Sequence, residues 1–247
     1  MTTNNNNRQN RSLGGADGST RMIAGLIALL IAAVAGEAQA DELTATAPTA
    51  AMGGWQGSAG VRTSLIKDRG FDPFATTDAL PQLSVSVARV LVRGRRAALT
   101  VGLGADTGTS DATARGAQAH LRVVRASVPL ELRYQAAERV YVFGRAAPGV
   151  LNVAARLTDP SAPAPLSADF NALSLDGSVG IAARVTPAFS RFGLWVQGDG
   201  GYGWTPSHDL VLAPDLTGAD KSKAGALTFS PLAARGAFFR LALAVSY

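Results

Sequence analysis

The chain has 247 residues, with 23 basic and 18 acidic side chains and no cysteine. The lack of cysteine excludes a disulfide scaffold, thiolate metal sites and a cysteine nucleophile. Charged residues make up 17% of the chain, below the roughly 25% of an average soluble domain. This composition, with its 27 glycines, favours β-structure with closely packed small residues or a membrane environment. The formal charge of +5 is too small and too dispersed to indicate a nucleic-acid partner.

The first 40 residues have the layout of a secretory signal peptide behind a long polar leader. Residues 1–20 are polar and have no apolar period, so we expect them to be disordered. A basic residue then precedes an apolar run from Met22 to Gly36, and an A-x-A site ending at Ala40 follows. We therefore predict a signal peptide at residues 21–40, cleaved after Ala40, and a linker at 41–53. The competing interpretation is a membrane anchor, for which the run is shorter than the usual 20 or so residues.

From residue 54 onward, apolar residues alternate with polar or small ones, which is the period of a β-strand. In the final segment the odd positions from Phe239 to Tyr247 are apolar, and the even positions carry Arg240 and small residues. Comparable alternation occurs in eight segments in all: 55–66, 83–92, 97–105, 124–134, 140–155, 173–185, 192–204 and 239–247. These segments predict eight strands, or ten if residues 226–236 or 41–50 also pair.

The connections between these segments form a second pattern. Short turns are expected at 93–96, 135–138 and 187–190, and long polar loops at 67–80, 106–117, 157–169 and 205–232. Long and short connections therefore alternate, as they do in barrels inserted into the outer membrane from one side. A sheet in lipid must close on itself, because unpaired backbone groups find no water there. We predict an all-β, up-and-down antiparallel transmembrane β-barrel over residues 54–247, located in the bacterial outer membrane.

The last strand also resembles the terminal strand of bacterial outer-membrane proteins. That family has an aromatic last residue with apolar residues at every second position before it, matched here by Phe239, Leu241, Leu243, Val245 and Tyr247. The resemblance implies that the barrel-assembly machinery reads this strand and that outer-membrane lipids surround the barrel. The stretches 128–134, 141–143 and 147–150 further resemble the central hairpin of small OmpA-like eight-stranded barrels.

If the apolar faces meet lipid, the opposite faces bring charged side chains into the lumen. The predicted interior network consists of Arg62, Arg125, Glu131, Arg133, Arg145, Asp176, Arg184, Asp199 and Arg240. Eight strands leave an interior that side chains fill, and buried charges need partners. We therefore expect hydrogen-bonded ion pairs, with Glu131, Asp176 and Asp199 as counterions of the arginines. Because arginines outnumber acids in this set, a narrow solute pore is an alternative.

The sequence contains few residues arranged for catalysis, and we expect no enzymatic activity, no cofactor and no metal site. His120 and Ser127 are the nearest approach to a lipid-modifying hydrolase, but the alternation predicts that His120 points outward and Ser127 inward. A nucleophile and its base must be in contact. We expect His208 to be solvated in the longest loop.

Two non-catalytic interpretations differ in the direction in which the apolar face of each strand points. A soluble lipocalin-like binder is also an eight-stranded barrel, but its apolar face would point inward. The favoured interpretation is a structural or surface-interaction barrel of the outer membrane. Its best candidate for contact with an external partner is the loop at residues 205–232, which carries several Asp and Lys residues.

Overall fold

The computed structural model describes residues 54–114, 116–160, 164–187, 192–214 and 226–247. Its elements are β1 (Trp55–Leu65), η1 (Asp72–Phe74), β2 (Ala79–Arg93), β3 (Ala97–Ala114), β4 (Ala117–Ser127), β5 (Leu130–Ala137), β6 (Val140–Thr158), β7 (Leu166–Arg184), β8 (Gly193–Trp204), β9 (Val211–Pro214), β10 (Leu227–Thr228) and β11 (Gly236–Ser246). The predicted leader, the signal peptide with cleavage after Ala40, and the linker lie outside the described residues. Among the residues that the structure describes, no helix is long and apolar enough to cross a membrane.

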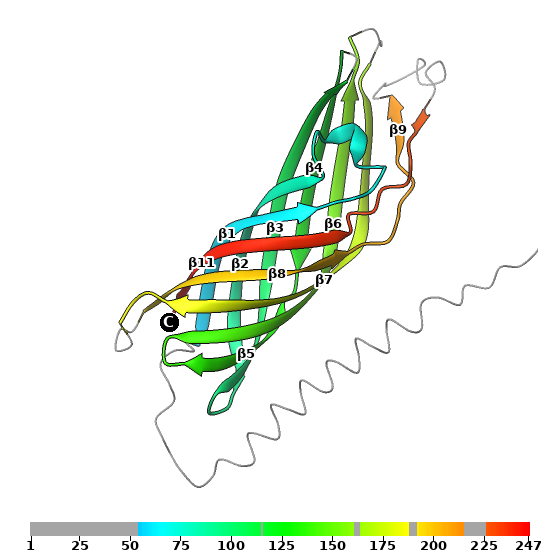
Figure 1. The fold of residues 1–247 in the computed structure, drawn as a ribbon. Helices are drawn as coiled ribbons and strands as arrows, with labels where there is room; N and C mark the ends of the chain where they lie inside the picture. Colours follow the sequence, from blue (N-terminus) through cyan, green and yellow to red (C-terminus); the bar gives the residue numbers. More distant parts are fainter. Residues whose placement is uncertain (1–53, 115, 161–163, 188–191, 215–225) are drawn as a thin grey trace, which may run out of the picture. The chain divides into compact units, whose positions relative to one another are not determined.

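The described strands close a ring of eight positions (Figure 1). Each strand pairs antiparallel with its neighbours along the chain, and β11 pairs with β1 from Gln56 opposite Ser246 to Ser64 opposite Phe238. β4 and β5 share one position, because β3 and β6 each pair with both. Pro129 lies in the gap between them, and proline has no backbone N–H to give to a ladder. The predicted eight-stranded up-and-down barrel is confirmed.

The two ends of the barrel differ. One end, here called the turn end, carries the connections β2–β3, β5–β6 and β7–β8 together with Tyr247, whose backbone pairs with Trp55. The other, the loop end, carries residues 66–78 and the described parts of the long connection between β8 and β11, 205–214 and 226–235. Within the latter, β10 pairs with β9 and β9 pairs with the start of β7, so both lie outside the ring. Residues 226–236 therefore do pair in part without adding strands to the barrel, and residues 41–50 are outside the described part.

The predicted long loop at 106–117 is wrong, because it is almost entirely strand, and the one predicted at 157–169 is shortened by strand at both of its ends. β3 continues to Ala114 and β4 starts at Ala117, so only a tight turn, with Gly116 at a φ of 87°, joins them. Glycine adopts this left-handed conformation without steric cost. β6 and β7 likewise extend into the range 157–169. The expected strict alternation of long and short connections consequently fails at the β3–β4 turn.

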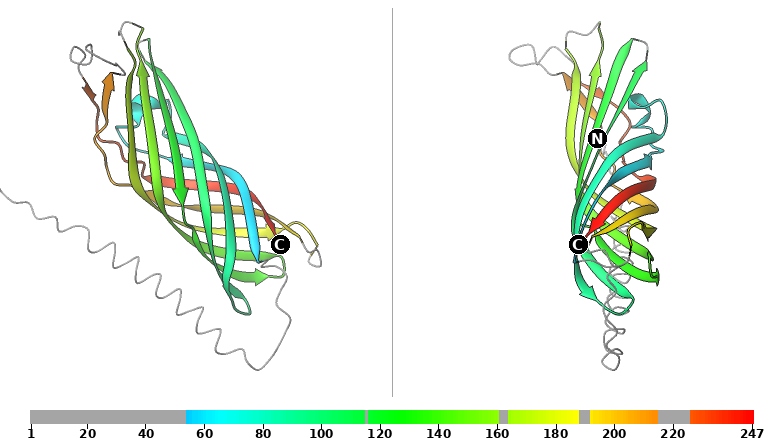
Figure 2. Two further views of the ribbon diagram at one scale, coloured as in Figure 1. Left: turned by 180° about the vertical axis from the view of Figure 1, so that it is seen from behind. Right: turned by 90° about the vertical axis from the view of Figure 1, so that its left-hand side faces the viewer.

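These extra residues build an extension of four strands, β3, β4, β6 and β7, beyond the ring, and Figure 2 shows it. β2 stops pairing with β3 at Gly108, and β8 stops pairing with β7 at Leu175. Beyond these points β3, β4, β6 and β7 remain paired with one another as an open sheet. In this open sheet, the alternation of polar and apolar side chains differs from that of the ring strands. The sequence of the extension therefore resembles that of a loop.

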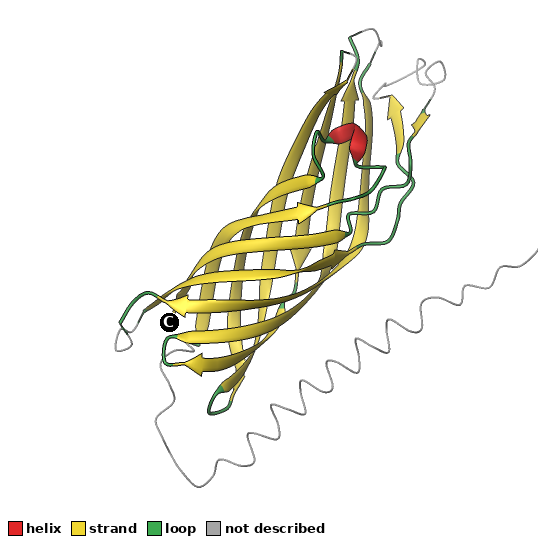
Figure 3. Ribbon diagram, viewed as in Figure 1, coloured by secondary structure: helices red, strands yellow, loops and turns green. Residues whose placement is uncertain are grey.

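A hydrophobic core fills the inward side of this extension. Strand residues such as Leu121 and Val153 meet Phe71 and Phe74 of the η1 segment, which Figure 3 shows as the helix beside the loop-end strands. The remaining buried members are Ile66, Leu80, Ala119, Val123, Leu151, Ala155, Leu210, Leu212 and Leu232. We call these 13 residues the cap core. It covers the lumen from the loop end.

The outer surface of the ring is an apolar belt. Leu83, Leu103, Val179 and Leu243 are each more than half exposed, as expected for side chains that face acyl chains. Arg89 shares this face but lies opposite Trp55 near the turn end, with its guanidinium 5.5 Å from the centre of the Trp55 ring. An arginine costs little at a membrane interface, about 0–1 kcal/mol.

Candidate functional site

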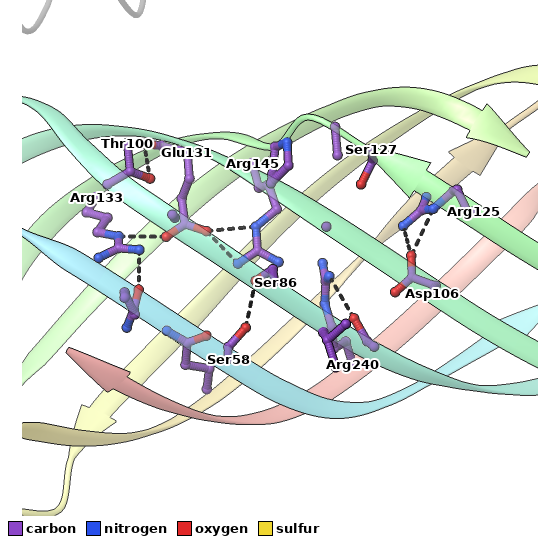
Figure 4. A pocket seen from close by; sticks show the side chains of 18 residues that line it. Ser58, Ser86, Thr100, Asp106, Arg125, Ser127, Glu131, Arg133, Arg145 and Arg240 are labelled. Atoms are coloured by element: carbon purple, nitrogen blue, oxygen red, sulfur yellow. Dashed lines mark hydrogen bonds and ion pairs between the residues drawn. The ribbon is translucent and has the colours of Figure 1, made fainter.

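The nine residues predicted for the interior network all lie on inward faces of the ring strands. Arg62, Arg125, Glu131, Arg133, Asp176, Arg184, Asp199 and Arg240 are 3–8% exposed, and the Arg145 side chain is 10% exposed. Figure 4 shows part of this network from close by, with Arg145 and Arg133 converging on Glu131 and with Arg125 beside Asp106. Two separate groups of ion pairs result.

The first group, here called the square, joins two arginines and two aspartates from four different strands. Arg62 contacts Asp176 at 2.5 Å and Asp106 at 3.5 Å. Arg125 donates to Asp106 at 2.8 Å through Nε and also binds Asp176. Each guanidinium thus contacts both carboxylates, and the four charges cancel. Because β1 and β7 are not neighbours in the ring, the Arg62–Asp176 contact crosses the lumen.

The second group, here called the chain, is linear. Glu131 accepts from Arg133 at 2.7 Å on one side and pairs with Arg145 at 2.5 Å on the other. Arg145 then approaches Asp199 at 3.9 Å, and Asp199 pairs with Arg240 at 2.8 Å. Positive and negative charges alternate along the chain, which begins and ends on an arginine.

Aromatic and amide side chains pack beside the chain. Tyr141, 1% exposed, receives hydrogen bonds at its hydroxyl from Gln56 at 3.3 Å and Gln197 at 2.5 Å. Trp195 is fully buried and donates to Ser246 at 3.0 Å. Arg184 donates to Thr186 at 3.3 Å, where β7 ends. This region of the lumen is filled with polar side chains that satisfy one another.

Little free volume remains between these side chains. A cavity of about 20 Å³ borders the chain and another of about 30 Å³ borders the square, and each has room for one or two waters. Ser174, which lines the second cavity, has the one buried side-chain oxygen in the described residues that lacks a hydrogen-bond partner. The described residues contain no group of three or more His, Cys, Asp or Glu side chains that could hold a metal ion.

The outward face of the extension is polar. His120 lies 2.6 Å from Asp111, and Asn152 donates to Asp169 at 2.7 Å and to Asn171 at 3.2 Å. Arg122 and Arg156 are exposed on the same face. His120 is indeed outward and Ser127 inward, so the two do not form a base and its nucleophile.

At one level of the barrel, the side chains therefore change character on both faces of the sheet: the outward face changes from apolar to polar, and the inward face from polar to apolar. On β7 the outward residues change from Leu173 to Asn171 and Asp169, while the inward residues change from Asp176 and Ser174 to apolar Ala172 and Phe170. The paired strands change at the same level, since Val150 lies opposite Leu173 and Asn152 opposite Asn171. An apolar outside with a polar inside suits lipid, and the reverse suits water.

Three features of the site escape the sequence pattern. Asp106, assigned to a loop, is 4% exposed and a corner of the square. The cap core draws on Phe71 and Phe74, which stand in a segment without strand period. His208 is not freely solvated as expected but partly buried, because it stacks on Phe170 with ring centres 5.1 Å apart and its backbone pairs with Leu232. Asp106 continues the even-numbered face of Thr100, Gly102 and Gly104, and this continuation was the available signal for the first.

The closed ring, apolar belt and charged lumen define the class: the fold is that of small eight-stranded outer-membrane β-barrels. No family model and no curated protein matches the sequence. Among solved structures, a major outer membrane protein from Thermus thermophilus is 17% identical, with a TM-score of 0.49, over 78% of this chain and 98% of that one. Neisserial surface protein A is 10% identical, with a TM-score of 0.46, over 78% and 97%. The outer membrane protease OmpT of Escherichia coli is 8% identical, with a TM-score of 0.40, over 78% and 93%.

Proposed function

We propose that the protein is a non-catalytic, integral barrel of the bacterial outer membrane that presents the four-stranded extension and its loops to partners outside the cell. The observation that carries the proposal is the inversion of polarity between Leu173 and Asn171, which both faces share. It separates a part suited to lipid from a part suited to water. The extension would then project beyond the membrane on the side of the long loops.

The outward polar face and the loop at residues 205–232 are the surfaces that we assign to an external partner. The described part of that loop is anchored by His208 and Leu232, whose backbones pair, and by burial of Leu210 and Leu212 in the cap core. A loop held in place in this manner loses less conformational entropy when it binds a partner. Export through the segment 21–40, with cleavage after Ala40, and recognition of the strand from Phe239 to Tyr247 by the assembly machinery belong to the same proposal.

The alternatives from the sequence have less support. The contact between Arg62 and Asp176 crosses the lumen, and the cap core covers its loop end, so a solute pore would need both to move. A soluble lipocalin-like binder would have the reverse arrangement of polar and apolar faces. We therefore assign the barrel a closed lumen.

Because the chain has no cysteine, single-cysteine variants test the orientation cleanly. We expect a membrane-impermeant maleimide to label Thr109→Cys and His120→Cys on intact cells. Ala136→Cys, next to the turn end, serves as the matched control and should react only after the outer membrane is permeabilised. Labelling of Ala136→Cys but not His120→Cys on intact cells, or recovery of the protein from the soluble periplasm, would contradict the proposal.

A further inference from the structure

Among the side chains that the structure describes, the chain of ion pairs carries an uncompensated positive charge. Its members are three arginines, Arg133, Arg145 and Arg240, and two acids, Glu131 and Asp199. The square, in contrast, has two of each sign. Its two carboxylates bind Arg62 and Arg125, so they are already committed to the charges of the square itself.

Within the described residues, neutral groups meet the two ends of the chain. At one end Arg133 donates to the Gln56 amide oxygen and lies 5.2 Å from the centre of the Tyr141 ring. At the other end Arg240 donates through its NH1 to the Ser84 hydroxyl at 3.5 Å, which is a long hydrogen bond. These contacts satisfy donors at both ends but add no negative charge.

An unbalanced charge is costly in this place. The five charged side chains of the chain are at most 10% exposed, and lipid surrounds the barrel at this level in the proposed orientation. Arginine does not lose its proton in proteins, so the charge cannot be relieved by titration of the guanidinium. A buried charge must instead be paired or strongly solvated.

The cavity of about 20 Å³ lies where such a counterion would sit. Four arginines line it, Arg125, Arg133, Arg145 and Arg240, against two acids, Asp106 and Glu131, so the charges of the lining sum to a positive value. The serines Ser84 and Ser86 also line it. Its volume suits one particle about the size of a water molecule. Guanidinium N–H groups and serine hydroxyls are donors, which is the chemistry that an anion requires.

We propose that this cavity binds one small monovalent anion of halide size, which neutralises the chain. The anion binds between the guanidinium groups of Arg145 and Arg240. With the anion in place, the chain has three charges of each sign and is neutral, as the square already is.

Replacing chloride by gluconate at constant ionic strength tests this in the full barrel, refolded in detergent. We expect the midpoint of thermal unfolding to rise by several degrees with chloride and to saturate, because gluconate is too large for the cavity. Gln56→Glu is nearly isosteric and places a carboxylate on Arg133. We expect this variant to be insensitive to chloride, since its chain already carries three acids.

Gln82→Glu is the matched control. Gln82 is buried and accepts from Ser64 beside the neutral square, so an added charge there should leave the chloride dependence of the chain in place. Equal midpoints in chloride and gluconate for the unaltered protein, or an unchanged chloride response in Gln56→Glu, would overturn the proposal.

A second measurement does not depend on any variant folding. Crystals of the unaltered protein grown in bromide should give an anomalous peak between Arg145 and Arg240. The absence of a peak at this place, with bromide peaks elsewhere on the surface, would also overturn it.

Discussion

Arg125 on β4 lies directly opposite Asp106 on β3 in the strand register, and its Nε donates to the Asp106 carboxylate at 2.8 Å inside the lumen. This cross-strand pair forms one side of the square. Since Arg62 and Asp176 complete the square from β1 and β7, a single network ties together strands on opposite sides of the ring.

Removing one carboxylate of the square should destabilise the barrel. Asp106→Asn keeps the shape of the side chain but leaves Arg62 and Arg125 with Asp176 alone. Breaking a buried pair in this manner costs about 3–5 kcal/mol, measured as the free energy of unfolding in urea from lipid vesicles. Asp111→Asn, whose side chain is 74% exposed, should cost less than about 0.5 kcal/mol. Equal costs at the two positions would refute the role of the square.

The free-energy cost of introducing an arginine on the outer surface should depend on whether its position lies in the apolar belt or in the extension. Val179 is 72% exposed and lies midway along the apolar outward residues of β7, so Val179→Arg should cost about 2–4 kcal/mol. Thr109→Arg changes an outward residue of the extension, where water would surround it, and should stay within about 0.5 kcal/mol. Unfolding from vesicles measures both. If the two variants are equally stable, the outward face of β7 does not lie in lipid.

We expect the cap core to open locally while the ring of strands stays folded. Phe74 is fully buried, packs 6.2 Å from the Phe229 ring, and accepts a hydrogen bond from Ser110 at its carbonyl. Phe74→Ala should weaken the cap core by about 3–5 kcal/mol, seen as faster hydrogen exchange in residues 66–78 with heat-modifiable migration of the barrel retained. Phe239→Ala, on the lipid face, serves as control, and its loops should exchange as slowly as in the unaltered protein.

A closed lumen predicts no ion conduction. The unaltered protein in planar bilayers should give no current steps above the empty membrane, because the square crosses the lumen and the cap core covers it. Regular steps that persist in protein carrying a cross-link between loop-end cysteines at Phe71 and Leu210 would contradict the closed state, since the cap could not then have moved.

The period-two pattern was sufficient to predict the strands of the ring and the facing of their side chains. Lipid on one side and a polar lumen on the other produce a clear alternation, as at Leu173 to Val185. Arg145 lies on a strand without a uniformly apolar face and was predicted to point inward, because an arginine at mid-membrane faces lipid only at a cost. Its side chain is 10% exposed.

The extension could not be predicted in the same way. On β3 beyond the apolar belt, the outward residues Thr109 and Asp111 are polar and the inward residues Gly108 and Ser110 are small or polar, so neither face of this strand has an apolar period there. The cap core forms from segments far apart in the chain, since Phe74, Leu121 and Leu212 join one cluster through tertiary packing alone. Asp106 belonged to a stretch rich in Asp, Thr and Gly, residues that also favour turns, and was therefore assigned to a loop.

Nitroxide labels along the outward face of β7 test the account most directly. In vesicles, labels at Leu173 and Val179 should be accessible to oxygen and shielded from a water-soluble nickel complex, whereas a label at Asp169 should show the opposite. A label at Val179 that is accessible to nickel, or one at Asp169 that lies in lipid, would contradict the placement of the membrane on which the proposed function depends.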